Sequence, residues 1–238
     1  MNQAQSLRVR QRTLEALLTS LRRFVLPLLG KKSNPALVRA VGAATRPYVN
    51  RARSTLAVSA TQQYRAFLAG EHPIVKPALN RFTKPAWSGS VNKVLSPGEV
   101  ITEEHITSLE HKAAWWAQDA ERGTLIHYAS QDKRVYAWAR VDGEPPSCPF
   151  CTVLISRGAV YHTQDAATVG EIGQFHTGCK CTAVLVSRDT LTSFEGYQQQ
   201  LDAEAEYVAA RKRATNKDLS GIVAAIKELR ANSEGKTP

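Results

Sequence analysis

The sequence is poor in cysteine, and the cysteines it has are confined to one segment. All 4 of them lie between Cys148 and Cys181 in a chain of 238 residues. No apolar run reaches the roughly 18 residues that a membrane-spanning helix needs, and the first residues lack the unbroken apolar core of a secretory signal. We therefore expect neither contact with a membrane nor secretion, and a reducing cytosol would oppose disulfides.

Acidic residues are nearly absent from the first quarter of the chain. Residues 1–60 contain 11 Lys and Arg and a single acid, Glu15, whereas the remainder is balanced in charge. The net charge of +10 is therefore concentrated in this quarter. Such asymmetry favours contact with nucleic acid or an acidic protein surface; a solvated helix face is the alternative. The candidate nucleic-acid contacts are Arg8, Arg12, Arg22, Arg23, Lys31 and Lys32.

Apolar residues at helical spacing predict a mainly helical chain. One stripe predicts a helix over residues 6–29, and Asn34 followed by Pro35 predicts the start of a second helix that runs to Gly70, with a bend at Pro47. A third helix is predicted to end near Gly123, followed by a short helix and a strand before residue 141. Helical pattern returns over residues 195–231, where Asp218 is a suitable cap.

These patterns predict an α+β fold that is mainly helical, with a small zinc-stabilised loop/β module near the C-terminal third. We expect four parts: a basic helical region (1–70), a Pro-rich connector with helices (71–140), a Cys/His module (141–190) and a helical tail (191–238). Within the module, short strands are expected around "VLIS", "AVYH" and "TAVLVS".

The cysteine segment has the spacing of a metal site. Cys148 and Cys151 form a C-x-x-C pair, and after 24 intervening residues follow His176, Cys179 and Cys181. Thiolate and imidazole suit Zn²⁺, and four protein ligands would make the site structural. The alternatives are two disulfides, a redox C-x-x-C pair, or clustered buried cysteines. Five candidates compete for four positions: either His176 lies outside four cysteine ligands, or His176 binds and Cys179 or Cys181 stays free.

The segment "YAWARV…CPFCTVLISRGAVYHTQDAA…FHTGCKCTAV" resembles the Mu F-like minor head proteins of tailed phages. It is most similar to an actinobacterial phage and prophage branch often labelled capsid maturation protease. The shared elements are the two cysteine motifs, Ser156-Arg157-Gly158 and Tyr161-His162-Thr163, and Tyr64-Arg65-Ala66 matches an upstream helical pattern. The resemblance covers about residues 50–186. Lys180 stands where many relatives carry Asp or Arg.

The resemblance implies a protein of phage capsid assembly that works near the portal. It implies contacts with the portal protein and the major capsid protein. It also implies that the protein is located in the host cytoplasm during assembly and in the interior of the virion. Non-specific DNA is a further expected partner, because packaged DNA is a dense polyanion.

Two other functions compete with this interpretation. A capsid maturation protease would need a nucleophile and a base, and Ser156, His162 and Asp165 are the candidates, although neither G-x-S-x-G nor H-E-x-x-H is present. A zinc-ribbon DNA-binding protein or nuclease is the second alternative, but residues 141–188 carry little positive charge. We expect a structural component rather than an enzyme.

Overall fold

The computed structural model describes residues 3–68, 77, 84–143, 146–162, 176 and 178–234. The chain divides into two compact units: residues up to Tyr128 together with His176 and Gly178 form the first, and the remaining residues from Ala129 onward form the second. Helices account for most of the described residues, and the strands among them form one two-stranded sheet. The predicted fold class is therefore confirmed. No helix in the described ranges is both long and apolar enough to cross a bilayer.

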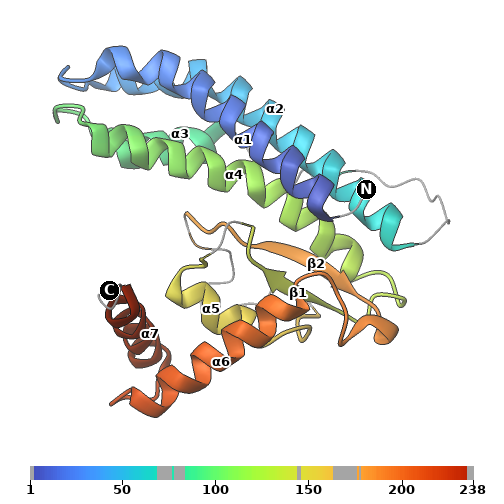
Figure 1. Cartoon of the computed structure of the whole chain (residues 1–238). Helices are drawn as coiled ribbons and strands as arrows, with labels where there is room; N and C mark the ends of the chain where they lie inside the picture. The colour runs from blue at the N-terminus through green and yellow to red at the C-terminus, as the bar shows by residue number, and fades with distance from the viewer. Residues whose placement is uncertain are drawn as a thin grey trace. The chain divides into compact units, whose positions relative to one another are not determined.

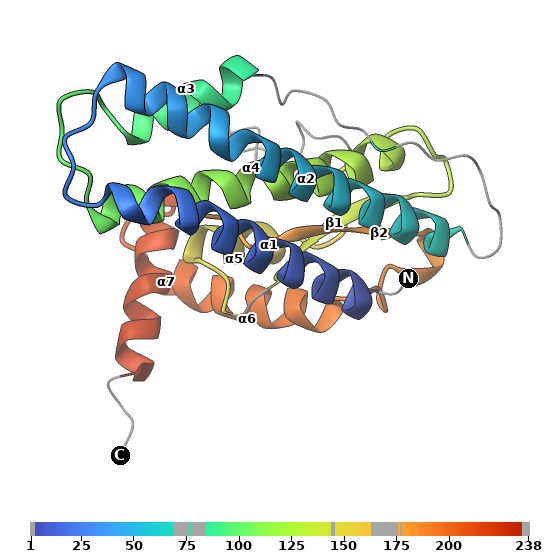
Figure 2. The same cartoon turned by 90° about the horizontal axis from the view of Figure 1, so that it is seen from above.

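Four helices build the first unit: α1 (Gln3–Val25), α2 (Pro35–Phe67), α3 (Lys84–Val94) and α4 (Glu103–Ala129). Helices α1 and α2 lie side by side, as Figures 1 and 2 show. A short 3₁₀ turn, Leu26–Leu28, follows α1. The backbone of the α1–α2 connection then pairs with the segment before α4, with Gly30 N donating to Ile101 O and Ile101 N donating to Lys31 O.

The start of α2 follows the prediction. Asn34 is extended, and its side-chain oxygen accepts a hydrogen bond of 2.9 Å from Leu37 N, while Pro35 occupies the first helical position. Pro47 lies inside the helix, which continues past it. The helix ends at Phe67, and the predicted end at Gly70 lies outside the described residues.

The core of this unit lies where the apolar stripe of α1 meets its neighbours. Leu17, Leu21 and Val25 of α1 are almost fully buried, as the helical spacing predicts. They belong to one cluster with residues of α2, α3 and α4, including Val49, Leu56, Trp87, Ile106 and Leu109.

Gly123 does not end a helix, and that prediction is wrong. Helix α4 runs through it to Ala129, so the short helix predicted after it is the last part of α4. Arg122 and Thr124, on either side of the glycine, are buried, as is Leu125. Packing of this segment outweighs the roughly 1 kcal/mol that glycine costs inside a helix.

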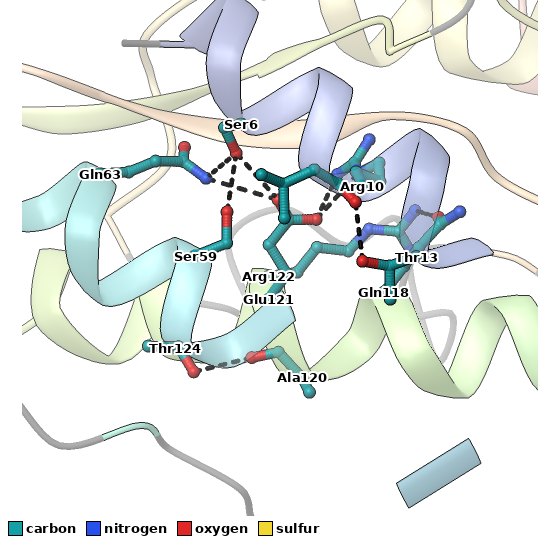
Figure 3. A network of polar contacts seen from close by, with 11 residues as sticks. Ser6, Arg10, Thr13, Ser59, Gln63, Gln118, Ala120, Glu121, Arg122 and Thr124 are labelled. Carbon is teal, nitrogen blue, oxygen red and sulfur yellow. Dashed lines mark hydrogen bonds and ion pairs between the residues drawn. The ribbon is translucent and has the colours of Figure 1, made fainter. Parts of the chain in front are cut away.

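A buried polar network joins α1, α2 and α4 (Figure 3). Its centre is Glu121, which accepts a hydrogen bond of 2.8 Å from Arg10 Nε; the side chains of this pair are only 2% and 6% exposed. Ser6 and Gln63 donate to the other carboxylate oxygen at 3.4 Å. Ser59 is also within hydrogen-bond distance of Ser6. The network places a charge pair inside the helical unit.

The second unit contains β1 (Ala137–Val141), α5 (Pro149–Ile155), β2 (Thr182–Val186), α6 (Tyr197–Arg213) and α7 (Leu219–Glu234). The strands pair antiparallel, with Ala137 opposite Val186 and Val141 opposite Thr182. The strand expected at "TAVLVS" is therefore confirmed. At "AVYH" only an isolated bridge forms among the described residues, between Trp138 and Tyr161.

The strand expected at "VLIS" is wrong, because these residues belong to the last part of α5 and its C-cap. Cys148 caps this helix and Pro149 occupies its first position, and together they start a helix where the apolar run alone suggests a strand. Val153 of α5 packs in a cluster with Ala210 of α6 and with Ile222 and Ile226 of α7. The predicted cap of α7 is confirmed, since Asp218 Oδ1 accepts from Gly221 N at 2.8 Å.

Candidate metal centre

The C-x-x-C pair is positioned by the start of α5. Cys148 is extended at the N-cap, and its Sγ accepts a hydrogen bond of 3.3 Å from Cys151 N. Cys151 lies in the first helical turn, where its side chain is buried, whereas Cys148 remains partly exposed. Both sulfurs are therefore held at one end of a short helix.

The second pair is positioned by β2. Cys181 immediately precedes Thr182, whose pairing with Val141 fixes the beginning of the strand. Cys179 lies two residues earlier, and both side chains are buried. Gly178, just before Cys179, has φ of +80°, a conformation that glycine adopts without strain.

The structure brings the predicted ligands into two groups of three that share Cys151. One group is Cys151, Cys179 and Cys181; the other is Cys148, Cys151 and His176. Within each group the ligand atoms all lie within 4.8 Å of one another. The sulfurs of Cys151 and Cys179 are 3.5 Å apart, and all four cysteines are free thiols.

These distances suit a metal site. Two sulfurs that each lie about 2.3 Å from a tetrahedral zinc are separated by about 3.8 Å, and a disulfide would require about 2.05 Å. The cysteine and histidine side chains can therefore hold a metal ion.

The thiols of Cys151 and Cys181 resist ionisation when no cation is present. The pKa of Cys151 is raised by hydrogen bonding to Cys148, Cys179 and Cys181, and further by burial. For Cys181, hydrogen bonding to Cys151 lowers the pKa, but hydrogen bonding to Cys179, burial and nearby negative charge outweigh it and raise the pKa well above the usual value. Several buried thiolates would repel one another, so a bound cation is what favours their ionised form.

A close-packed shell surrounds α5. Tyr161 donates a hydrogen bond of 2.7 Å to Leu154 O, and its ring centroid lies 4.8 Å from that of Trp138.

Gly158 has φ of +67°, and a Cβ there would lie 2.5 Å from the side chain of Gln200. The glycine of the "SRG" turn therefore has a steric cause, because a larger residue at this position would be strained and would displace Gln200.

An arginine of α7 braces the segment that carries the C-x-x-C pair. Arg230 donates two hydrogen bonds to Glu206 of α6, at 2.7 and 2.9 Å. It also donates to Ser147 O and, at 2.8 Å, to Thr152 Oγ1. Ser147 precedes Cys148 and Thr152 follows Cys151, so one guanidinium ties both flanks of the pair to the helical tail. Sequence reasoning missed this brace, because nothing local marks Arg230.

The candidate protease residues do not form a described catalytic pair. Ser156 Oγ donates to Val153 O at 2.9 Å, and the ring of exposed His162 lies against Tyr136 with centroids 5.7 Å apart. No hydrogen bond joins Ser156 to His162, both of which the structure describes. Asp165 and Thr163 lie outside the described residues.

The candidate nucleic-acid contacts differ in their surroundings. Arg8, Arg12, Arg23, Lys31 and Lys32 are all exposed. Arg22 is half exposed and makes a two-bonded ion pair with Glu110 of α4, at 2.6 and 3.2 Å. Two further arginines of the basic quarter pair with acids of α4: Arg10 with Glu121 and Arg53 with Asp119. Part of the N-terminal charge is thus neutralised within the fold.

Fold and site together define a mainly helical protein with a cysteine-rich candidate metal module in its C-terminal half. The chain belongs to the VG15 protein family, whose model matches residues 1–210, and it is accordingly a phage protein. Neither the curated proteins nor the solved structures include a significant match.

Proposed function

We propose that this phage protein is a minor head protein of capsid assembly, a structural component with a C-terminal module stabilised by Zn²⁺. The observation that carries the proposal is the buried group Cys151, Cys179 and Cys181, with further ligands at Cys148 and His176. Membership of a phage family and the sequence resemblance to Mu F-like minor head proteins support the assembly role.

The metal has a structural role in this proposal. Three thiolates and a fourth protein ligand would fill a tetrahedral shell and leave no position for an activated water. The described β-structure of this unit is a single two-stranded sheet, and a sheet of this size has little stability alone. A metal that joins the start of α5 to the start of β2 would contribute its binding free energy to the folding of the unit.

In a shell built on Cys151, Cys179 and Cys181, the fourth ligand is either Cys148 or His176. Replacing the metal by Co²⁺ distinguishes the two, because charge-transfer and ligand-field absorption differ between four sulfurs and three sulfurs with one nitrogen. Cys148→Ser and His176→Asn are the matching variants. The variant that removes the fourth ligand changes the cobalt spectrum, whereas the other variant leaves it as in the wild type.

The proposed place of action is the interior of the phage head near the portal. The partners are the portal protein and the major capsid protein, and packaged DNA is a further, non-specific partner of the basic helices. The test is incorporation into heads assembled in the host cytoplasm. Loss of Cys148 and Cys151 together should reduce the amount of this protein in purified heads, and unchanged incorporation would contradict the proposal.

Proteolysis is the competing function, and it makes a different prediction. Alanine at Ser156, His162 and Asp165 together leaves capsid-protein processing unchanged if the protein is structural. If processing stops in such a variant that still folds and binds metal, the protein is a maturation protease.

A further inference from the structure

A groove runs between α1 and α2 on the surface of the first unit. Its volume is about 310 Å³. The α1 side includes Arg12, and the α2 side includes Tyr48, Arg51 and Thr55. The structure thus places two arginines from different helices at one concave surface. Arg51 was not among the residues that the sequence suggested for nucleic-acid contact.

The groove arginines differ from those that stabilise the fold. Arg10, Arg22 and Arg53 are each paired with an acid of α4. Arg12 and Arg51 are exposed, and in the described part of the chain no ion pair joins either of them to a carboxylate. The acids of α4 therefore neutralise other arginines and leave positive charge at the groove.

The hydroxyl groups of α1 in the groove are already engaged. Thr13 Oγ1 donates its proton to Val9 O at 2.7 Å, and Ser20 Oγ donates to Ala16 O at 2.7 Å. A hydroxyl has one proton, so neither group can also donate it to a ligand. The charged donors of the groove are its two guanidinium groups, and their geometry matches the oxygens of a phosphate.

The charge continues along α1 beyond the groove. Arg8 is exposed and lies four residues before Arg12, about 6 Å along the helix axis at 1.5 Å per residue. Residues four apart share a helix face. The cations therefore form a row, which suits a chain of phosphates better than one small anion.

We propose that the α1–α2 groove binds the phosphodiester backbone of double-stranded DNA through Arg12 and Arg51. The inference rests on the DNA contact in the proposed function and assigns it to a site. Arg22 is not a main contact in this proposal, because Glu110 already neutralises its charge and accepts from its Nε and Nη2. Binding to the backbone is independent of base sequence, since contacts to phosphate carry no sequence information.

The test compares two pairs of substitutions in the full-length protein. Arg12→Gln with Arg51→Gln removes the groove charges. Arg39→Gln with Lys93→Gln is the control, because it removes the same charge from exposed positions outside the groove. Both pairs should keep the wild-type thermal unfolding profile, since all four side chains are exposed.

Binding to a short DNA duplex is then measured by fluorescence anisotropy over a series of salt concentrations. The slope of log K against log salt concentration is negative, and each lost phosphate contact reduces its magnitude by about 0.9. The groove pair should therefore reduce this magnitude by nearly 2 and weaken binding at low salt by about tenfold or more. The control pair should retain most of the affinity. Equal weakening by both pairs, or wild-type binding by the groove pair, would overturn the inference.

A second polyanion separates DNA from an acidic protein partner. Poly-glutamate should compete only weakly, because an extended polypeptide carries about one charge per 3.3–3.6 Å, whereas duplex DNA carries about one per 1.7 Å and releases more counterions on binding. If the groove pair loses poly-glutamate binding but keeps DNA binding, the groove is a protein-binding surface and the proposal is wrong. Head incorporation is measured independently, so a protein that enters heads but binds no DNA overturns this inference alone.

Discussion

Replacing Glu121 by glutamine should destabilise the first unit far more than the same change at Glu110. Both residues lie on α4 and both pair with an arginine of α1. The difference is burial: the side chain of Arg10 is 6% exposed, whereas that of Arg22 is 52% exposed. The two substitutions therefore compare a glutamate whose arginine partner is buried with one whose arginine partner is half exposed.

The expected magnitudes follow from what each change leaves behind. Glu121→Gln leaves a buried guanidinium without its counter-charge, which costs about 3–5 kcal/mol. Glu110→Gln leaves a guanidinium that is half exposed to water, so this change should cost much less. For a unit of this size each kcal/mol corresponds to several degrees, so Glu121→Gln should lower Tm by about 10 °C or more.

Hydrogen exchange of the α4 amides measures this effect, because it reports the opening of the first unit independently of the second. Replacing Arg10 and Glu121 together by methionine should recover most of the lost stability, since an apolar pair leaves no buried charge. If Glu121→Gln costs no more stability than Glu110→Gln, the buried pair of Arg10 and Glu121 contributes no more to this unit than the half-exposed pair of Arg22 and Glu110.

The second unit yields three further predictions. Arg230→Met should reduce the stability of this unit by about 1–3 kcal/mol in chemical denaturation, because Ser147 and Thr152 lose a charged donor. Arg211→Met, at an exposed position of α6, should have little effect. Similar results for both variants would refute the stabilising role of Arg230. Gly158→Ala should destabilise by about 1–2 kcal/mol, because a positive φ strains a residue with a Cβ, whereas the flexible end of Gln200 can move aside. Wild-type denaturation would refute that reasoning. Metal-free protein should lose stability as pH rises above about 8.5, because the thiols of the unfolded chain ionise before those of the folded chain, whose pKa values are raised. Metal-loaded protein should instead lose stability as pH falls. Parallel pH profiles of unfolding in the two forms would contradict a thiolate-bound metal.

Local signals predict the helix boundaries well where a cap decides them. Asn34 with Pro35 and Asp218 both start helices as expected, because their effect depends only on neighbouring backbone groups. The same local reasoning fails at Gly123 and at "VLIS". There, tertiary packing and an unusual cysteine cap decide the outcome, and periodicity does not contain that information.

The ligand candidates can be found from the sequence, but their supporting contacts cannot. Spacing identifies Cys148, Cys151, Cys179 and Cys181 as candidates, because metal ligands occur as short local pairs. Arg230, in contrast, lies 83 residues from Ser147, whose carbonyl it binds. In the first unit, Glu121 lies 111 residues from its partner Arg10. Contacts of this kind depend on how the helices pack, and a single sequence carries no local signal for them.

The metal content of the purified protein tests the central claim most directly. The measurement is inductively coupled plasma mass spectrometry on protein prepared without added chelator, followed by thermal unfolding with and without a strong chelator. We expect about one Zn²⁺ per chain, lost in Cys151→Ser, and a lower unfolding temperature of the second unit after chelation. Protein that carries no stoichiometric metal and unfolds identically in chelator would contradict a zinc-stabilised module.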